Sequence, residues 1–329
     1  MKRLWLSVLS VFILAAILSG YFYFNLSRIV PESKNQLKET MDFLNSDTIN
    51  YDIVFIGSSR VYVHIDPRVI DSACQVNSVC VAMDGSTITQ QLALLQKYLE
   101  KHPAPKLVML GLDYSSLQAS LLPYNYPDYY AYLNDSAFAT INSRAISRFQ
   151  NRKFFEKYDA FMKYSAKTDY QKFASLSSTL MLPKKYDNLS DEPSWFSALV
   201  TYKGFCGLEK GWSAEAEKQL ALNEKVTYEK QGLDFLNEFV ELSKQHSSKV
   251  VIVFSPMFNN EKKQFEGSAK YFEKVKEVTT RQEVPLWDYR NDSLCFDKKF
   301  FYNTGHLNKL GAEIFSLKLA KDLNQYIAL

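Results

Sequence analysis

The sequence predicts a three-layer α/β/α domain built around a parallel sheet, and two observations carry that prediction. Short apolar runs of strand length recur along the chain, and stretches with the apolar spacing of helices lie between them. Within each run the apolar residues are continuous rather than alternating, which is typical of strands buried on both faces. The chain has 329 residues, a length that suits one large domain with an insertion or two smaller domains.

The predicted elements alternate along the chain. The strands are, in order, "DIVFIGSS", "SVCVAMDG", "KLVMLGLDYSS", "KVVIVFSP" and "VPLWDY". A helix is predicted over 88–102, after the second strand, because apolar residues recur there at helical spacing: Ile88, Leu92, Leu95 and Leu99. Later helices are predicted in "FLNEFVELSKQH", "AKYFEKVKEVTTRQ" and "NKLGAEIFSLKLAKDLNQYI". This order of strands and helices is typical of parallel sheets.

The N-terminal residues 1–28 predict a membrane anchor. The 21 residues of 4–24 carry no charge and are long enough to cross a bilayer core as a helix. Lys2 and Arg3 precede them, and an aromatic belt ends them: Tyr21, Phe22, Tyr23 and Phe24. A cleaved signal peptide is the alternative, since "ILSG" offers small residues, but the apolar run continues past that point. We therefore expect an uncleaved single-pass anchor with the rest of the chain outside the cytoplasm.

Two further segments differ from the alternating pattern. Residues 29–50 are polar and helix-prone, and they predict a stalk. Residues 51–329 form the predicted domain, in which residues 117–225 are too long for a loop and are rich in Tyr, Phe, Ser and Lys. This stretch predicts a mostly helical insertion that caps the sheet.

The composition is that of a globular protein, with 47% hydrophobic and 23% charged residues. The net charge of +3 and the lack of a basic tract argue against a nucleic-acid partner. The cysteines do not have zinc-ligand spacing, and no constellation of histidines and carboxylates predicts a metal site. In an oxidising compartment Cys74 could pair with Cys80, and Cys206 with Cys295; four buried free thiols are the alternative.

A candidate nucleophile lies where the first strand ends, in Gly57-Ser58-Ser59-Arg60. Ligands of open α/β sheets gather at the carboxyl ends of strands. A serine there needs a base, usually a histidine, and donors for the oxyanion. His306 is the favoured base, because it lies in a short polar loop just before an amphipathic helix. The other histidines are expected to be structural or solvated at helix ends: His64, His102 and His246.

These motifs resemble those of the SGNH/GDSL hydrolase superfamily, over residues 52–113 and 249–329. The resemblance is greatest to the membrane-anchored branch that includes DltD-type proteins and polysaccharide O-acetyl-modifying enzymes. It implies an SGNH/flavodoxin-like fold, with Ser59 as the nucleophile and His306 of "GHLNKLGA" as the base. It also implies that the N–H groups of Ser59 and Gly85 hold the oxyanion.

Two positions depart from the family pattern. The acid expected three residues before the histidine is Asn303, which can hold the ring but does not stabilise an imidazolium as a carboxylate does. The acid could come instead from Asp288, Asp292 or Asp297, or the site could use a Ser-His dyad. Asp113 stands near the position of the asparagine that donates to the oxyanion, where an ionised carboxylate would repel it.

Arg60 and several aromatic residues are candidate substrate contacts. Arg60 could clamp a carboxylate or phosphate, or it could anchor the turn through an ion pair with Asp66 or Asp113. Aromatic residues could stack on sugar rings or could simply pack within the domain: the tract 124–133, Trp195, Phe196 and Trp212.

The resemblance implies a membrane-tethered serine esterase or O-acyltransferase that acts on acyl esters of a cell-surface glycan. We expect it at the bacterial cytoplasmic membrane, with the catalytic domain on the extracytoplasmic side, no cofactor, and an envelope protein as a further partner. The alternative is a catalytically silent domain of the same fold that binds glycan or scaffolds an envelope assembly; Asn303 and Asp113 favour it. A Rossmann-type binder is disfavoured, because "GSSRVY" lacks the GxGxxG fingerprint.

Overall fold

The computed structural model describes residues 5, 7–18, 36–46, 48–119, 137, 200–220, 224–259 and 265–327. Its main sheet contains five parallel strands in the order β2-β1-β3-β7-β9. The strands are β1 (Ile53–Gly57), β2 (Ser78–Ala82), β3 (Leu107–Gly111), β7 (Lys249–Phe254) and β9 (Leu286–Asp288). Every predicted strand is present, and the prediction of a parallel sheet is confirmed.

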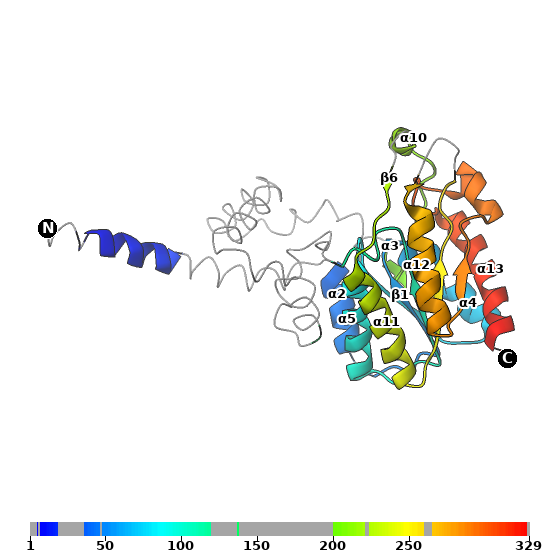
Figure 1. The fold of residues 1–329 in the computed structure, drawn as a ribbon, viewed down its shortest axis with the longest axis horizontal. Helices are drawn as coiled ribbons and strands as arrows, with labels where there is room; N and C mark the ends of the chain where they lie inside the picture. Colours follow the sequence, from blue (N-terminus) through cyan, green and yellow to red (C-terminus); the bar gives the residue numbers. More distant parts are fainter. Residues whose placement is uncertain are drawn as a thin grey trace.

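Helices cover both faces of the sheet (Figure 1), which confirms the three layers. One face packs against α2 (Gln36–Asn45), α5 (Ile88–Lys101), α11 (Lys230–Gln245) and α12 (Ser268–Arg281). The other packs against α3 (Ser59–His64), α4 (Pro67–Cys74) and α13 (Lys309–Ile327). Successive residues of β1 enter the two cores in turn: Val54 joins the first core and Phe55 the second. Both side-chain rows of a strand are therefore buried, which is why its apolar residues are continuous.

Short elements complete the described part of the chain: β4 (Val200–Tyr202), β5 (Phe205–Cys206), α10 (Ala214–Gln219), β6 (Glu224–Lys225), β8 (Phe265–Glu266), and the 3-10 helices η3 (Ser293–Phe296) and η4 (Lys298–Phe300). The hairpin β4–β5 and α10 belong to the stretch 117–225 that was expected to be a mostly helical insertion. Most of that stretch, 120–199 apart from residue 137, lies outside the described residues.

Two features of the local structure were not predicted. Residues 29–50 were expected to form a stalk, but α2 within them packs onto the sheet through Leu37, Met41 and Leu44, each at most 1% exposed. The residues after the first strand were not predicted to be helical, yet they form α3 and α4. All six side chains of α3 are buried, so this helix has no polar face to reveal its period.

The N-terminal residues are described in part. Residues 7–18 are helical, and their apolar side chains are exposed. Within the described residues, none of the helices combines the length and apolarity needed to cross a membrane. The rest of the expected anchor, including the whole aromatic belt, lies outside them.

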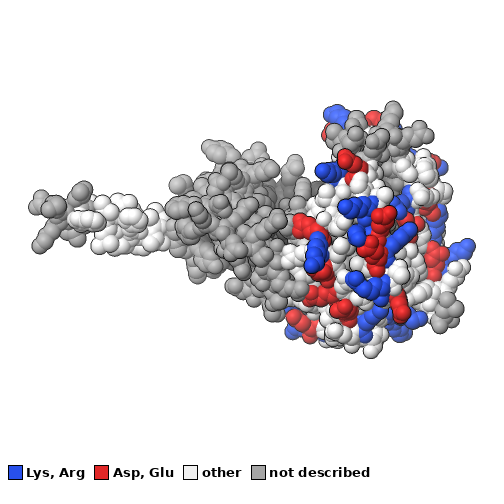
Figure 2. Space-filling view, viewed as in Figure 1, with Lys and Arg blue, Asp and Glu red and all other residues white. Residues whose placement is uncertain are grey.

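The structure shows the state of the cysteines and the distribution of the surface charges. Cys74, Cys80, Cys206 and Cys295 are all free thiols, as the second alternative expected, but only the last three are buried and Cys74 is partly exposed. Figure 2 shows Lys and Arg side chains interspersed with Asp and Glu side chains on the face over α11 and α12. This mixture accords with the small net charge of +3.

Candidate active site

The turn after β1 holds Ser59 at the start of α3, and the glycine that ends the strand makes this turn possible. A Cβ on Gly57 would lie 2.3 Å from Val61 Cγ2 and 2.9 Å from the carbonyl oxygen of Gly111. A Cβ on Gly111, at the end of the neighbouring strand β3, would also lie 2.3 Å from Val61 Cγ2. The two glycines let α3 pack directly on the ends of both strands. Ser59 is thereby fixed at the carboxyl edge of the sheet, 7% exposed.

The structure brings the three residues Ser59, His306 and Asn303 into one hydrogen-bonded chain. His306 Nε2 lies 2.8 Å from Ser59 Oγ, and His306 Nδ1 lies 3.0 Å from Asn303 Oδ1. The backbone N–H groups of Gly305 and His306 also donate to Asn303 Oδ1, each at 2.9 Å. Two fixed donors on one atom identify that atom as the amide oxygen.

This orientation of Asn303 determines the tautomer of the histidine. Because Asn303 Oδ1 can only accept, His306 Nδ1 carries the proton and donates it. Nε2 therefore keeps its lone pair and accepts the hydroxyl proton of Ser59. A neutral imidazole aimed in this way at a serine is the arrangement that general-base activation requires.

The surroundings of His306 keep its ring neutral. Burial and the nearby positive charge of Arg60 lower the pKa of His306 to about 4, against a partial opposing effect of Asp113. The uncharged Asn303 does not offset this lowering as a carboxylate would. At neutral pH the ring is therefore a free base.

His64 is a second histidine next to the site, and its role is structural, as expected. Its Nε2 accepts the backbone N–H of Leu307 at 3.0 Å, so its Nδ1 is the protonated nitrogen and donates to Ser255 Oγ at 2.9 Å. Burial, followed by the charge of Arg60, lowers the pKa of His64 well below its ordinary value. Its ring meets that of His306 edge-on, with centroids 6.2 Å apart. Both nitrogens are occupied, so His64 supports the loop that carries His306.

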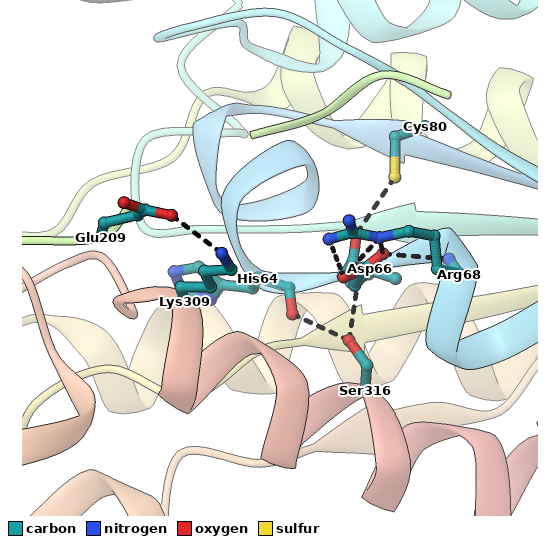
Figure 3. Close-up of polar contacts among 8 residues, drawn as sticks. His64, Asp66, Arg68, Cys80, Glu209, Lys309 and Ser316 are labelled. Atoms are coloured by element: carbon teal, nitrogen blue, oxygen red, sulfur yellow. Dashed lines mark hydrogen bonds and ion pairs between the residues drawn. The ribbon is translucent and has the colours of Figure 1, made fainter. Parts of the chain in front are cut away.

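Contacts between α13 and the residues after α3 hold the two halves of the site together (Figure 3). Ser316 Oγ of α13 accepts the backbone N–H of Asp66 at 2.8 Å and donates to the carbonyl oxygen of His64 at 3.4 Å. The Asp66 carboxylate is paired with Arg68 at 2.6 Å. The serine side and the histidine side of the site are thus joined by polar contacts in the second core.

Arg60 is directed into the interior, which corrects both interpretations of this residue. Its side chain is only 6% exposed and, among the described residues, forms no ion pair with Asp66 or Asp113, although the charge of Asp113 acts on it. The guanidinium lies 4.6 Å from the centroid of the Phe254 ring, and Nη2 donates to the carbonyl oxygens of Ser255 and Pro256. Within the described residues Nε and Nη1 have no hydrogen-bond partner. The arginine is therefore not presented at the surface as a clamp, and it acts on the site through its charge.

Asp113 was expected near the oxyanion, and its contacts show that it offers no donor there. Its carboxylate accepts hydrogen bonds from Ser58 Oγ at 2.5 Å, from the N–H and hydroxyl of Ser115 at 2.9 and 2.7 Å, and from Ser116 Oγ at 3.2 Å. The carboxylate is thus an acceptor that fixes the ends of β1 and β3 relative to each other. Gly85, the other expected donor residue, follows β2 with φ of 58°, a conformation that favours glycine.

Asp84 is a residue of the site that the sequence did not reveal. The Ser59 side chain, the backbone N–H of Gly85 and the hydroxyl of Tyr62 each act to lower the pKa of its carboxyl. Burial, opposed by these contacts, raises the pKa of Asp84. The available signal was its position: Asp84 directly precedes Gly85 at the end of the strand that neighbours β1.

The other candidate residues do not join the site. The three alternative acids pair with lysines or arginines: Asp288 with Arg290, Asp292 with Lys318 and Asp297 with Lys299. Trp212 packs against Phe258 and donates to Glu217, whereas the other aromatic candidates lie outside the described residues. Within the described residues no group of three His, Cys, Asp or Glu side chains is arranged to hold a metal ion.

Comparison with known protein families finds no match, and no curated protein matches in sequence. Solved structures align over most of the chain. An acetyl xylan esterase aligns at 11% identity and a TM-score of 0.40, over 82% of this chain and 98% of that one. A family two carbohydrate esterase from Clostridium thermocellum aligns at 8% identity and a TM-score of 0.38, over 86% and 66%.

Proposed function

We propose that this protein is a serine esterase or O-acyltransferase that acts on acyl esters of a cell-surface glycan. The observation that carries the proposal is the chain from Ser59 to His306 to Asn303, in which the tautomer of the histidine is fixed by the asparagine. A buried serine held 2.8 Å from the lone pair of a neutral imidazole has the geometry of an activated nucleophile.

The proposed reaction begins with Ser59 Oγ attacking the carbonyl carbon of the acyl ester. The new Oγ–C bond forms, the carbonyl π electrons move to oxygen, and the hydroxyl proton passes to His306 Nε2. The N–H group of Ser59 stabilises the oxyanion, and the N–H of Gly85, which acts on the Asp84 carboxyl in the resting site, is the second proposed donor. The intermediate then expels the sugar alcohol, which takes the proton from Nε2, and leaves an acyl-serine.

The second half of the reaction determines the product. Water, deprotonated by His306, would release the acyl group as a carboxylic acid, whereas a sugar hydroxyl in its place would complete an acyl transfer. Asn303 orients the imidazolium that forms in each half but does not neutralise it. We therefore expect a slower enzyme than one with a carboxylate at this position.

The proposed glycan substrate and extracytoplasmic location follow from the resemblance of the motifs and from the N-terminal residues. The exposed apolar side chains of residues 7–18 support a tether to the bacterial cytoplasmic membrane. An envelope protein as a further partner remains part of the proposal.

The test is labelling of the full chain, purified in mild detergent, with a fluorophosphonate probe, followed by peptide mapping. We expect the probe on Ser59, and we expect Ser59→Ala and His306→Ala to abolish labelling. Ser58→Ala is the matched control, because the Ser58 hydroxyl is bonded to Asp113 rather than to the histidine; it should still be labelled. A folded protein that stays unlabelled would refute the proposal.

A catalytically silent, glycan-binding or scaffolding domain is the second candidate, and Asn303 and Asp113 favour it. The same Ser59→Ala variant separates the two in cells. An enzyme loses its biological effect while the fold remains intact, whereas a scaffold retains it.

A further inference from the structure

The side chain of Gln36 pairs with the backbone at the end of β2. Gln36 is the first residue of α2, and it is only 9% exposed. Its Nε2 donates to the carbonyl oxygen of Ala82 at 3.0 Å, and its Oε1 accepts the backbone N–H of Asp84 at 2.9 Å. The amide donates through one end and accepts through the other, so these two contacts determine its orientation.

These two hydrogen bonds have the pattern of a parallel β-ladder. In such a ladder a residue donates to one carbonyl of the neighbouring strand and accepts the N–H that lies two residues further on. The amide of Gln36 does the same with Ala82 and Asp84, on either side of Met83. Because β2 is the outermost strand on its side of the main sheet, its outer backbone groups need other partners. The helix α2 thus extends the sheet by a single amide, at the carboxyl edge.

The turn that follows β2 is held from two sides. It is closed by the N–H of Ser86, which donates to the carbonyl of Met83 at 3.2 Å, and Gly85 occupies its third place with φ of 58°. On the inner side the carbonyl of Gly57 accepts the N–H of Met83 at 3.1 Å and the hydroxyl of Ser86 at 2.9 Å. On the outer side the turn is held by Gln36.

We propose that Gln36 is a positioning residue, which holds this turn beside Ser59 so that the N–H of Gly85 stays in place as an oxyanion donor. The inference rests on the proposed function. Gly57 pairs with Ala82 in the register of β1 and β2, so the nucleophile and the turn leave the sheet side by side. Without Gln36 the turn is held only from its inner side, and a displacement of about 1 Å in a catalytic site can cost about 100-fold in rate.

The course of α2 explains how its first residue reaches the site. The helix begins beside Ala82, at the carboxyl edge, and the chain after it passes Thr48, whose hydroxyl donates to the carbonyl of Lys101 at the end of α5 at 3.0 Å. It lies beside α5 (Figure 1) and is fixed by burial of Leu37, which directly follows Gln36. The segment that was expected to be a stalk is therefore part of the site, and it enters the domain at the edge that carries the nucleophile.

The first test is Gln36→Met in the full chain, purified in mild detergent, because methionine has a similar length but cannot make either hydrogen bond. Hydrolysis of p-nitrophenyl acetate should show kcat lowered about ten- to a hundredfold, since the oxyanion donor is displaced. KM should change less than about twofold, because the ground-state ester does not depend on that donor. Fluorophosphonate labelling of Ser59 should slow by a similar factor, since the phosphonyl oxygen uses the same donors.

Two further measurements separate this role from a general effect on α2. Asn45→Ala is the matched control, because it removes an amide at the other end of the helix that donates to the carbonyl of Met41 at 2.8 Å; its kcat and KM should equal those of the wild type. Hydrogen exchange read by mass spectrometry should be faster in Gln36→Met over residues 82–87, by more than the single amide of Asp84. Exchange in the later turns of α5 should not change.

The inference is overturned if folded Gln36→Met keeps the wild-type kcat, or if Asn45→Ala lowers kcat equally. If the wild type neither hydrolyses the ester nor is labelled, the proposed function fails, and hydrogen exchange alone decides whether Gln36 holds the turn. Faster exchange beyond the amide of Asp84 then supports that role, and faster exchange confined to this amide overturns it.

Discussion

His64 and His306 are two histidines whose ring centroids lie 6.2 Å apart, yet their roles differ. Both are neutral, and in both cases burial and the charge of Arg60 lower the pKa. They differ in what occupies the second nitrogen. A backbone N–H fills Nε2 of His64, whereas Nε2 of His306 faces the hydroxyl of Ser59.

The comparison teaches that a low pKa does not by itself identify a base. The hydrogen bond at Nδ1 sets the tautomer in each ring, and the partner at Nε2 decides whether that nitrogen can receive a proton from a substrate-facing group. The following predictions test this distinction.

The largest effect should come from His306→Ala. Loss of a positioned base should lower ester hydrolysis and labelling of Ser59 by about 10²–10⁴-fold. The free energy of unfolding, measured in urea, should change by less than about 1.5 kcal/mol, because only two hydrogen bonds at a half-buried ring are lost. Activity close to that of the wild type would remove His306 from the mechanism.

His64→Phe should show the reverse pattern. The buried N–H of Leu307 and the hydroxyl of Ser255 would lose their partner, which should cost about 2–4 kcal/mol of unfolding free energy. The folded fraction should still be labelled on Ser59. Loss of labelling equal to that of His306→Ala, in a variant of unchanged stability, would mean that the two histidines act together.

Asn303→Asp tests what a negative charge at the third residue of the hydrogen-bonded chain would add. A carboxylate can accept the same two backbone N–H groups and would stabilise the imidazolium, so the pKa of His306 should rise by about 1 unit or more. The ascending limb of activity should then move up from about pH 4. The maximal rate should increase about tenfold. Asn303→Ala, which removes the acceptor, is the control for loss of the side chain, and an Asn303→Asp variant indistinguishable from the wild type would show that charge at this position is irrelevant.

The smallest effect should be on stability against pH. Both histidines have a pKa lowered in the folded state, so the unfolded chain binds more protons than the folded chain below pH 6.5. Stability should therefore fall as pH drops from about 6.5 toward 4, and it should fall less steeply in His64→Phe than in the wild type. Asp84, with a raised pKa, acts in the opposite direction. Equal slopes in the two proteins would contradict the buried, neutral state of His64.

Most of the fold could be predicted because its signals are local. An apolar run such as Ile53–Gly57 needs no distant partner to be identified as a strand, and α13 shows its helical period in its own residues. The helix α3 could not be found in this way, since burial on all sides removes the periodic pattern. The packing of α2 depends on a tertiary contact that its polar composition hides.

The residues of the site also fall into those that the local sequence reveals and those that depend on the fold. Ser59 and His306 could be proposed from their places, at a strand end and in a polar loop. Asp84 was missed because it acts on Ser59 only through the fold, which no spacing encodes. The interior position of Arg60 was equally hidden, since arginine is rarely buried without an ionic partner.

The separation of 247 positions between Ser59 and His306 has a consequence for biosynthesis. At 5–20 residues per second, a ribosome needs roughly 12–50 s to reach the base after it has added the nucleophile. Over most of that interval β3 has β1 on one side but lacks β7 on the other, so the nascent chain displays an unpaired apolar edge. The proposed nucleophile is thus without its base while the chain is being made, and the same delay exposes the chain to aggregation until β7 has been translated.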